Sequence, residues 1–450
     1  MRWMMELARF ALVLFVFVYF GTAMDLFMLS KGYVGIPPTK ILMAAAGAYA
    51  FLLLIEPGHH ALNRALTNIN HAAGPVVMYI LFCTTFVAWG LHPTANLQGG
   101  AAYVYLSLYN LMFFGLAFLA FSDEAILKHR KLLLFVPFLV MVVSIWVEIK
   151  WPLLFTDEEF GRKSGFASQP NAAAFFIVIF MLMLLDFKRP KITDMIIYGV
   201  GAIGVFATFS RGGYLLTIIV GVLMATKIIL SGKTKPMLTL AAGVVMLYAF
   251  FYLAVTELHY LEKGGAYQRL ELMLSGDFEE IVEGESTEDR KDLFDKHLAL
   301  ALESPVLGHG TGYTYTGLEG GGPHNVYLQI WCNQGLLGVL MVIGLLFAMV
   351  RHFWRYRDVK GLVFVCLLIV EGFLNHNIYD QRPVILLMAA FTAYIVSSKA
   401  THHLARSEKE RAIAFIRNLD RHRKADSTPA PARRKSTTKR VKETHVDLVL

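Results

Sequence analysis

Four basic residues lie on the predicted outer side of the membrane, where basic residues are expected to be few. Their side chains can bind an anion. They are Arg162, Lys163, Arg211 and Arg382. Arg211 is the most informative, because it lies in the very short turn Ser210-Arg-Gly-Gly between two apolar segments, where Gly212 and Gly213 leave the backbone free to approach a ligand. A guanidinium there is costly unless it reaches lipid headgroups or has an anionic partner. Both interpretations are open for one arginine alone, but several arginines on one face favour an anion site, since the planar guanidinium suits phosphate oxygens.

A histidine offers a second kind of chemistry, which is proton transfer. His324 lies where an acidic segment enters a long apolar one, in the sequence Pro-His-Asn. The positive end of a helix dipole opposes protonation there, so the neutral ring can accept a proton near neutral pH. The alternative is a histidine that caps the helix at the membrane interface. Asn325, Gln329 and Asn333 follow at i, i+4 and i+8, and this polar stripe should face protein or water rather than lipid.

Three acidic residues interrupt apolar segments near their outer ends. They are Asp25, Glu148 and Glu371, the last followed one turn later by Asn375 and His376. We interpret them as structural partners of the arginines, because a buried charge needs a counter-charge. No set of His, Cys, Asp or Glu has the spacing of metal ligands, and the three cysteines all lie in apolar segments. The sequence therefore predicts neither a metal site nor a cofactor.

The elements that must position these residues are membrane-spanning helices. Hydrophobic residues make up 56% of the 450 residues and charged residues 17%, against roughly 45–50% and 25% in soluble domains. The apolar residues fall into blocks close to the ~20 residues that cross a bilayer as a helix. The predicted spans are 7–29, 37–55, 74–92, 101–121, 131–149, 172–187, 192–209, 212–230, 236–256, 324–350, 360–378 and 384–398. The sequence therefore predicts an all-α, polytopic membrane protein with about twelve transmembrane helices.

The orientation of these helices follows from the distribution of lysine and arginine, which concentrate in short cytoplasmic loops. Placing both termini in the cytoplasm puts the basic loops inside and the four anomalous basic residues outside. The largest outer loop, residues 257–323, is acidic. It contains a predicted helix from Arg290 to Glu303, with a capping signal before it and Pro305 after it, and a glycine-rich connection to His324. We expect a small helical region there.

The C-terminal part differs in composition from the rest of the chain. Residues 1–398, which include the 257–323 loop, form the predicted transmembrane domain, and residues 399–450 form a basic cytoplasmic tail that is predicted to be largely disordered. The tail accounts for most of the net charge of +8. Such a run can bind nucleic acid, but beside a membrane domain it favours attraction to anionic lipids. We therefore expect membrane lipids, and no nucleic acid, as its partners.

Four segments, taken together, resemble the O-antigen ligase and O-antigen polymerase superfamily of membrane glycosyltransferases. They are Gly161-Arg-Lys-Ser-Gly-Phe-Ala-Ser-Gln-Pro-Asn171, Phe209-Ser-Arg-Gly-Gly-Tyr-Leu215, Arg290 through Gly310, and Pro323-His-Asn325 with Gly335-Leu-Leu-Gly338. The resemblance covers about half of the chain and implies transfer of a glycan from undecaprenyl pyrophosphate to an acceptor hydroxyl, without a metal, at the periplasmic face of a bacterial inner membrane. It implies that Arg162 and Arg211 hold the pyrophosphate and that His324 assists the hydroxyl. Many members have a glutamate where Asn333 stands, so no carboxylate role is assigned to that position.

The acceptor separates the activities within this superfamily. A ligase uses the lipid A core, a polymerase uses another lipid-linked glycan, and a protein O-oligosaccharyltransferase uses a protein. The modest outer loop favours a ligase. A single displacement would invert the anomeric centre, and no separate nucleophile is evident. Lys163, Asn325, Gln329, Arg382, His376 and Glu371 are candidate supporting residues. A transporter of lipid-linked glycan is the alternative of another class, and it predicts polar residues and broken helices near the midplane of the membrane.

Overall fold

A computed structural model describes residues 2–56, 60–92, 97–151, 154–155, 162–187, 190–230, 285–316, 322–375 and 377–397. Every regular element in these residues is a helix. Four helices are long and apolar enough to cross a membrane, or up to six if each of two bent helix pairs counts as one span. Four shorter apolar helices accompany them in the described ranges. The chain is therefore a multi-pass helical membrane protein, whereas the expected count of twelve spans is not confirmed.

The first half of the chain supplies eleven helices within the described residues. They are α1 (Arg2–Tyr19), α2 (Met24–Ser30), α3 (Pro38–Leu54), α4 (His60–His71), α5 (Ala73–Trp89), α6 (Leu97–Ala120), α7 (Glu124–Leu127), α8 (Arg130–Lys150), α9 (Pro170–Leu184), α10 (Ile192–Ala207) and α11 (Arg211–Leu230). A 3-10 helix, η1 (Gly165–Ala167), precedes α9. Most of these bounds lie within a few residues of the predicted spans, because long apolar runs determine them locally.

The second half contributes fewer described elements. They are α15 (Glu285–Glu303), α16 (Tyr313–Thr316), α17 (Val326–Arg355), α18 (Val359–Leu374), η3 (Ile378–Asp380) and a helix over Arg382–Ser397. α15 confirms the predicted helix in the acidic loop, although it begins five residues earlier than expected. The predicted span 236–256 and the tail from residue 399 lie outside the described residues. The predicted division into two domains stays a prediction.

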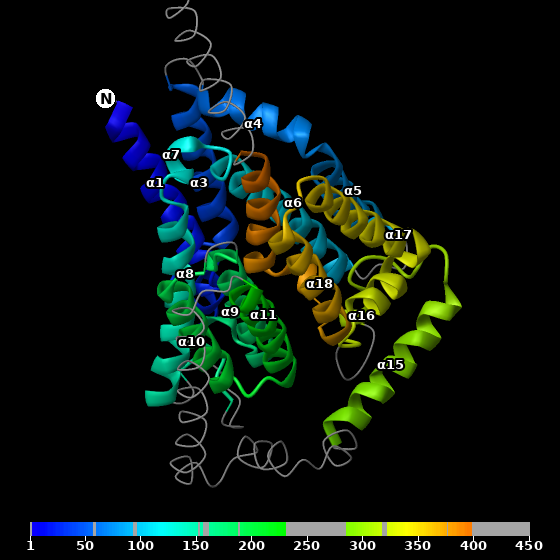
Figure 1. Cartoon of the computed structure of the whole chain (residues 1–450). Helices are drawn as coiled ribbons and strands as arrows, with labels where there is room; N and C mark the ends of the chain where they lie inside the picture. The colour runs from blue at the N-terminus through cyan, green and yellow to red at the C-terminus, as the bar shows by residue number, and fades with distance from the viewer. Residues whose placement is uncertain are drawn as a thin grey trace, which may run out of the picture. The chain divides into compact units, whose positions relative to one another are not determined.

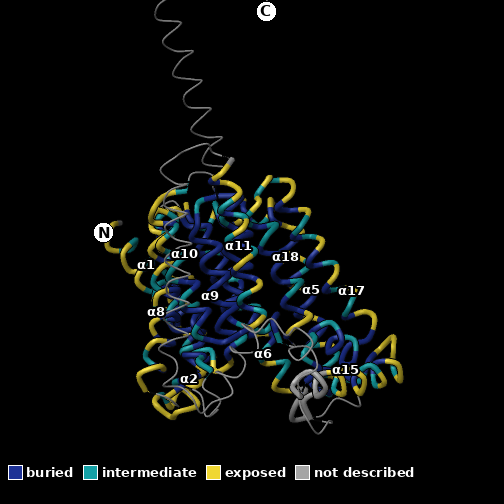
Figure 2. Tube along the Cα trace, turned by 60° about the horizontal axis from the view of Figure 1, so that its bottom comes forward, coloured by how far each residue is buried: buried dark blue, intermediate teal, exposed yellow. Residues whose placement is uncertain are grey.

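α9 lies at the centre of one group of helices. All of its residues except Asn171 are buried, and it packs against α8, α10 and α11, as the dark blue tube in Figure 2 shows. A second group is formed by α5, α6, α17 and α18 (Figure 1). α18 joins the two groups, because it contacts both α17 and α9. Lys360 at the start of α18 donates to the Met183 carbonyl at the end of α9, at 3.2 Å, so the start of α18 and the end of α9 share one end of the molecule.

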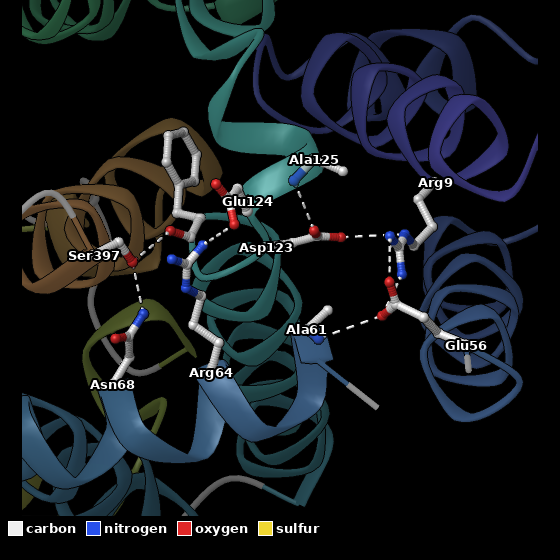
Figure 3. Close-up of polar contacts among 10 residues, drawn as sticks. Arg9, Glu56, Ala61, Arg64, Asn68, Asp123, Glu124, Ala125 and Ser397 are labelled. Carbon is white, nitrogen blue, oxygen red and sulfur yellow. Dashed lines mark hydrogen bonds and ion pairs between the residues drawn. The ribbon is translucent and has the colours of Figure 1, made fainter. Parts of the chain in front are cut away.

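A cluster of charged residues ties the helices together near the end of α6 (Figure 3). The guanidinium of Arg9, which is 1% exposed, lies 2.9 Å from the Glu56 carboxylate and 3.2 Å from that of Asp123. Tyr49 donates to Asp123 as well, at 3.3 Å, and Arg64 pairs with Glu124 at 2.9 Å. The cluster joins α1, α3 and α4 to the α6–α7 turn and contains none of the predicted site residues.

Candidate functional site

Arg162 lies in the short connection between α8 and η1, and two neighbouring elements fix its side chain. Its Nε donates to the carbonyl of Thr208 at 3.3 Å, and its Nη2 donates to Oδ1 of Asn171 at 2.8 Å. The guanidinium therefore joins the first turn of α9 to the turn that precedes α11. Lys163 follows and is half-buried.

The backbone beside Arg162 is held by the end of α8. The Glu148 carboxylate accepts hydrogen bonds from the backbone amides of Ser164 and Gly165, both at 2.8 Å. Gly165 has a φ of +53°, and a Cβ there would lie 2.0 Å from Oγ of Ser144. Only glycine fits such a position, because a side chain would be both strained and blocked. The segment that carries Arg162 is thus built into the bundle.

Arg211 is the first residue of α11 and its side chain is exposed. Ser210 caps this helix, since its Oγ accepts from the backbone amide of Gly213 at 3.1 Å. A Cβ on Gly213 would lie 2.4 Å from Cβ of Ala174 on α9. This glycine therefore permits close helix packing, rather than the ligand approach that the sequence suggested. Arg162 contacts the turn that carries Arg211, because the Thr208 carbonyl that it binds lies three residues before Arg211.

His324 directly precedes the start of α17 and is half-buried, with a φ of +49°. The helix is capped by Asn325, whose Oδ1 accepts from the backbone amides of Tyr327 at 3.0 Å and Leu328 at 3.1 Å. Capping, the alternative role for the histidine, is thus performed by its neighbour. His324 therefore lies one residue before the N-cap of α17, at the positive end of the helix.

The last turns of α18 lie between the Arg211 turn and the start of α17. On one side, a Cβ on Gly212 would lie 3.1 Å from Cδ1 of Leu374. On the other side, Tyr327 donates to the carbonyl of Ile369 at 3.1 Å, and its ring lies 4.8 Å from that of Phe373. The structure therefore brings the turns that carry Arg162, Arg211 and His324 to the same end of the helix bundle.

The polar stripe on α17 divides into different roles. Asn333 anchors α16, since its Oδ1 accepts from the amide of Thr314 at 3.1 Å and its Nδ2 donates to Oγ1 of Thr314 at 3.3 Å. Gln329 lies between the two asparagines and is 4% exposed. Within the described part of the chain, its Oε1 has no hydrogen-bond partner. The outer two residues of the stripe are structural, whereas the amide oxygen of the middle one is buried without a partner among the described residues.

The glycine-rich segment before α16 packs tightly on α17. The amides of His309 and Gly310 donate to the carbonyls of Cys332 and Asn333, both at 2.8 Å. A Cβ on Gly308 would lie 2.5 Å from the backbone nitrogen of Gly335. These glycines serve a close approach of two backbones. The second glycine run, 320–322, lies mostly outside the described residues.

Arg382 forms a buried ion pair with Asp25. Its Nη1 lies 2.6 Å from Oδ2 of Asp25, and its guanidinium lies 4.8 Å from the centre of the Tyr109 ring. The expectation that an acidic residue in an apolar segment pairs with an arginine is confirmed for Asp25. Glu371 lies in the last turn of α18, where its backbone carbonyl accepts from the amide of Asn375 at 2.8 Å. His376, another predicted supporting residue, lies outside the described residues.

Asp380 is a chemically interesting residue to which the sequence assigned no role. It ends η3, where Nδ2 of Asn110 donates to its carboxylate at 3.2 Å. Burial raises the pKa of Asp380 from 3.8 to about 7. The neighbouring Tyr379 hydroxyl lies 3.4 Å from that of Tyr327, which places η3 beside the first turn of α17. A lone carboxylate between His376 and Arg382 was the available signal. In the described ranges, no group of three or more His, Cys, Asp and Glu is placed to hold a metal ion.

The fold and this end of the bundle define a multi-pass membrane protein that carries two arginines and a histidine at one end of its helices. Residues 195–343 match the protein-family model described as O-Antigen ligase, so the chain carries a domain of the O-antigen ligase family. The matched residues include Arg211 and His324, whereas Arg162 lies before them. No curated protein matches the chain.

Proposed function

We propose that this protein is a glycosyltransferase that moves a glycan from undecaprenyl pyrophosphate to an acceptor hydroxyl, and that it is an O-antigen ligase whose acceptor is the lipid A core. The observation that carries the proposal is the contact of Arg162 with the turn that carries Arg211, at the same end of the bundle as His324. The family match supports the lipid-linked glycan as the class of substrate. Both termini lie in the cytoplasm and the reaction takes place at the periplasmic face of a bacterial inner membrane, which the distribution of lysine and arginine supports.

The arginines act on the leaving group. Departure of the glycan leaves negative charge on the pyrophosphate, and fixed guanidinium groups stabilise that charge without reorganising. Arg162 is held in place by Thr208 and Asn171, and Arg211 extends from the first turn of α11. A guanidinium binds two phosphate oxygens at once, which an ammonium group cannot do with the same geometry.

His324 acts on the acceptor. The hydroxyl oxygen attacks the anomeric carbon, the bond between that carbon and the phosphate oxygen breaks, and the pyrophosphate departs with the electron pair. The hydroxyl proton passes to the imidazole, which acts as the general base. Attack opposite the leaving group inverts the anomeric centre. In this proposal Gln329, whose amide oxygen has no hydrogen-bond partner among the described residues, orients the acceptor.

Purified protein in lipid nanodiscs, supplied with lipid-linked glycan and lipid A core, tests this proposal. Arg211→Lys should lower transfer by about 100-fold or more, because it removes one bidentate contact to the developing charge. Arg351→Lys, an exposed arginine near the end of α17, is the matched control and should retain activity. Full activity of Arg211→Lys would reduce that arginine to a headgroup anchor.

The histidine is tested separately from donor binding. His324→Gln keeps hydrogen-bonding ability without useful basicity, so transfer should be nearly abolished while the lipid-linked donor still binds. His71→Gln, an exposed histidine at the end of α4, serves as the control. Substantial transfer by His324→Gln would leave the histidine as an orienting residue. Transfer to another lipid-linked glycan or to a protein, but not to lipid A core, would reassign the acceptor, and flipping of the donor without transfer would support a transporter.

A further inference from the structure

The turn that follows α15 exposes a group of large apolar side chains. Leu302 in the last turn of α15 is 61% exposed, and Val306 and Leu307 in the turn itself are 61% and 57% exposed. Leu336, Leu337 and Leu340 on α17 continue this surface, at 49%, 39% and 51% exposure. Loops that face water are usually polar, and a contiguous exposed apolar patch marks an interaction surface. α15 is seen beside α17 at the edge of the molecule in Figure 2.

Two backbone carbonyls of this turn bond to protein groups, although the side chains of the turn are exposed. The carbonyl of Pro305 accepts from the indole of Trp331 at 2.9 Å and from the amide of Leu336 at 2.9 Å. The carbonyl of Leu307 accepts from the indole of Trp89. Backbone groups of a water-exposed turn can bond to water, whereas in lipid each must find a partner in the protein. Tryptophan is the residue that concentrates at membrane interfaces.

The position of the turn along α17 fits the edge of the hydrocarbon layer. α17 is interrupted at Gly335, where φ is 62° and ψ is −161°. The part after this break, from Leu336 to Arg355, has about 20 residues, the length that crosses ~30 Å of hydrocarbon. Pro305 bonds to the first residue after the break. The turn therefore lies at the level where the spanning part of α17 begins.

We propose that Leu302, Val306 and Leu307 insert into the bilayer leaflet at the end of the bundle that holds Arg211 and His324, with lipid acyl chains as the partner. Lipid acyl chains are the partner because this surface continues into the exposed leucines of the spanning part of α17. The insertion holds α15 at the membrane surface, with Asp292 and Lys296 exposed. It also supports the glycine segment that packs on α17, and it is independent of the proposed glycosyl transfer.

Single bimane labels in proteoliposomes test the insertion. Cys366 is the exposed cysteine of the described residues, and Cys83 and Cys332 are buried; the background is therefore Cys366→Ala. Bimane on Val306→Cys should lose at least half of its fluorescence in vesicles of dibrominated phosphatidylcholine and should resist aqueous iodide. Lys296→Cys, on the polar part of α15, is the control and should respond in the opposite way.

Two outcomes overturn the proposal. Quenching of the Val306 label by iodide to the level seen at Lys296, without an effect of brominated lipid, would place the turn in water. Protection from both quenchers would show that protein covers the surface, as a second copy of the chain would. Leu302→Cys provides an independent label if the Val306 variant does not fold, and the same criteria apply to it.

Discussion

The buried pair of Asp25 and Arg382 gives a prediction of stability that can be worked out from the structure. The two groups are 2.6 Å apart, and their side chains are 0% and 10% exposed. Neither side chain can be rehydrated without opening the packing of α2 against its neighbours. Removal of one partner leaves the other buried without a counter-charge, which costs about 3–5 kcal/mol. Asp25→Asn and Arg382→Gln should each lower the melting temperature by on the order of 3–5 °C.

The double variant separates the ion pair from the packing. Asp25→Asn combined with Arg382→Gln leaves two neutral amides of similar size, so most of the lost stability should return. Thermal unfolding of the detergent-solubilised protein, monitored by size-exclusion chromatography, gives the melting temperatures of the wild type, the two single variants and the double variant. Two results would refute the idea that Asp25 and Arg382 compensate each other's charge. One is an unchanged melting temperature in the single variants, and the other is a double variant whose loss of melting temperature equals the sum of the two single losses.

Three further predictions concern sidedness, pH and the break in α17. Single cysteines at Glu283 and Gly320 should react with an impermeant thiol reagent in spheroplasts while one at Ser436 should not, and the opposite pattern would reverse the proposed face. Burial raises the pKa of Asp380 from 3.8 to about 7, so the wild type should lose stability as the pH rises from 3.8 to about 7. The melting temperature of Asp380→Asn should not show this fall with pH. The same fall in the variant would exclude the carboxyl group as its source. Gly335→Ala should lower the yield of folded protein in size-exclusion chromatography, because a Cβ there would lie 2.1 Å from the Val306 carbonyl; a normal yield would show that the turn can move.

The sequence determined the helical, membrane-spanning character of this protein and most helix bounds. α3 runs from Pro38 to Leu54, against a predicted 37–55, and α8 from Arg130 to Lys150, against 131–149. These features depend on runs of neighbouring apolar residues and on the ~20 residues that a bilayer requires, so they are encoded locally. The sequence also identified Arg162, Arg211 and His324 as chemically unusual, because charge and polarity at the ends of apolar segments are visible without a fold.

Only the tertiary structure decided which of these residues are buried and which are exposed. Arg382 and Arg211 look alike in sequence, yet Arg382 is buried beside Asp25, which is far away in the chain, while Arg211 is exposed at a helix start. The break at Gly335 was likewise not predicted, because its backbone conformation follows from the approach of the 305–310 segment and not from its neighbours. Such contacts join residues that are distant in sequence, and the packing of helices determines them.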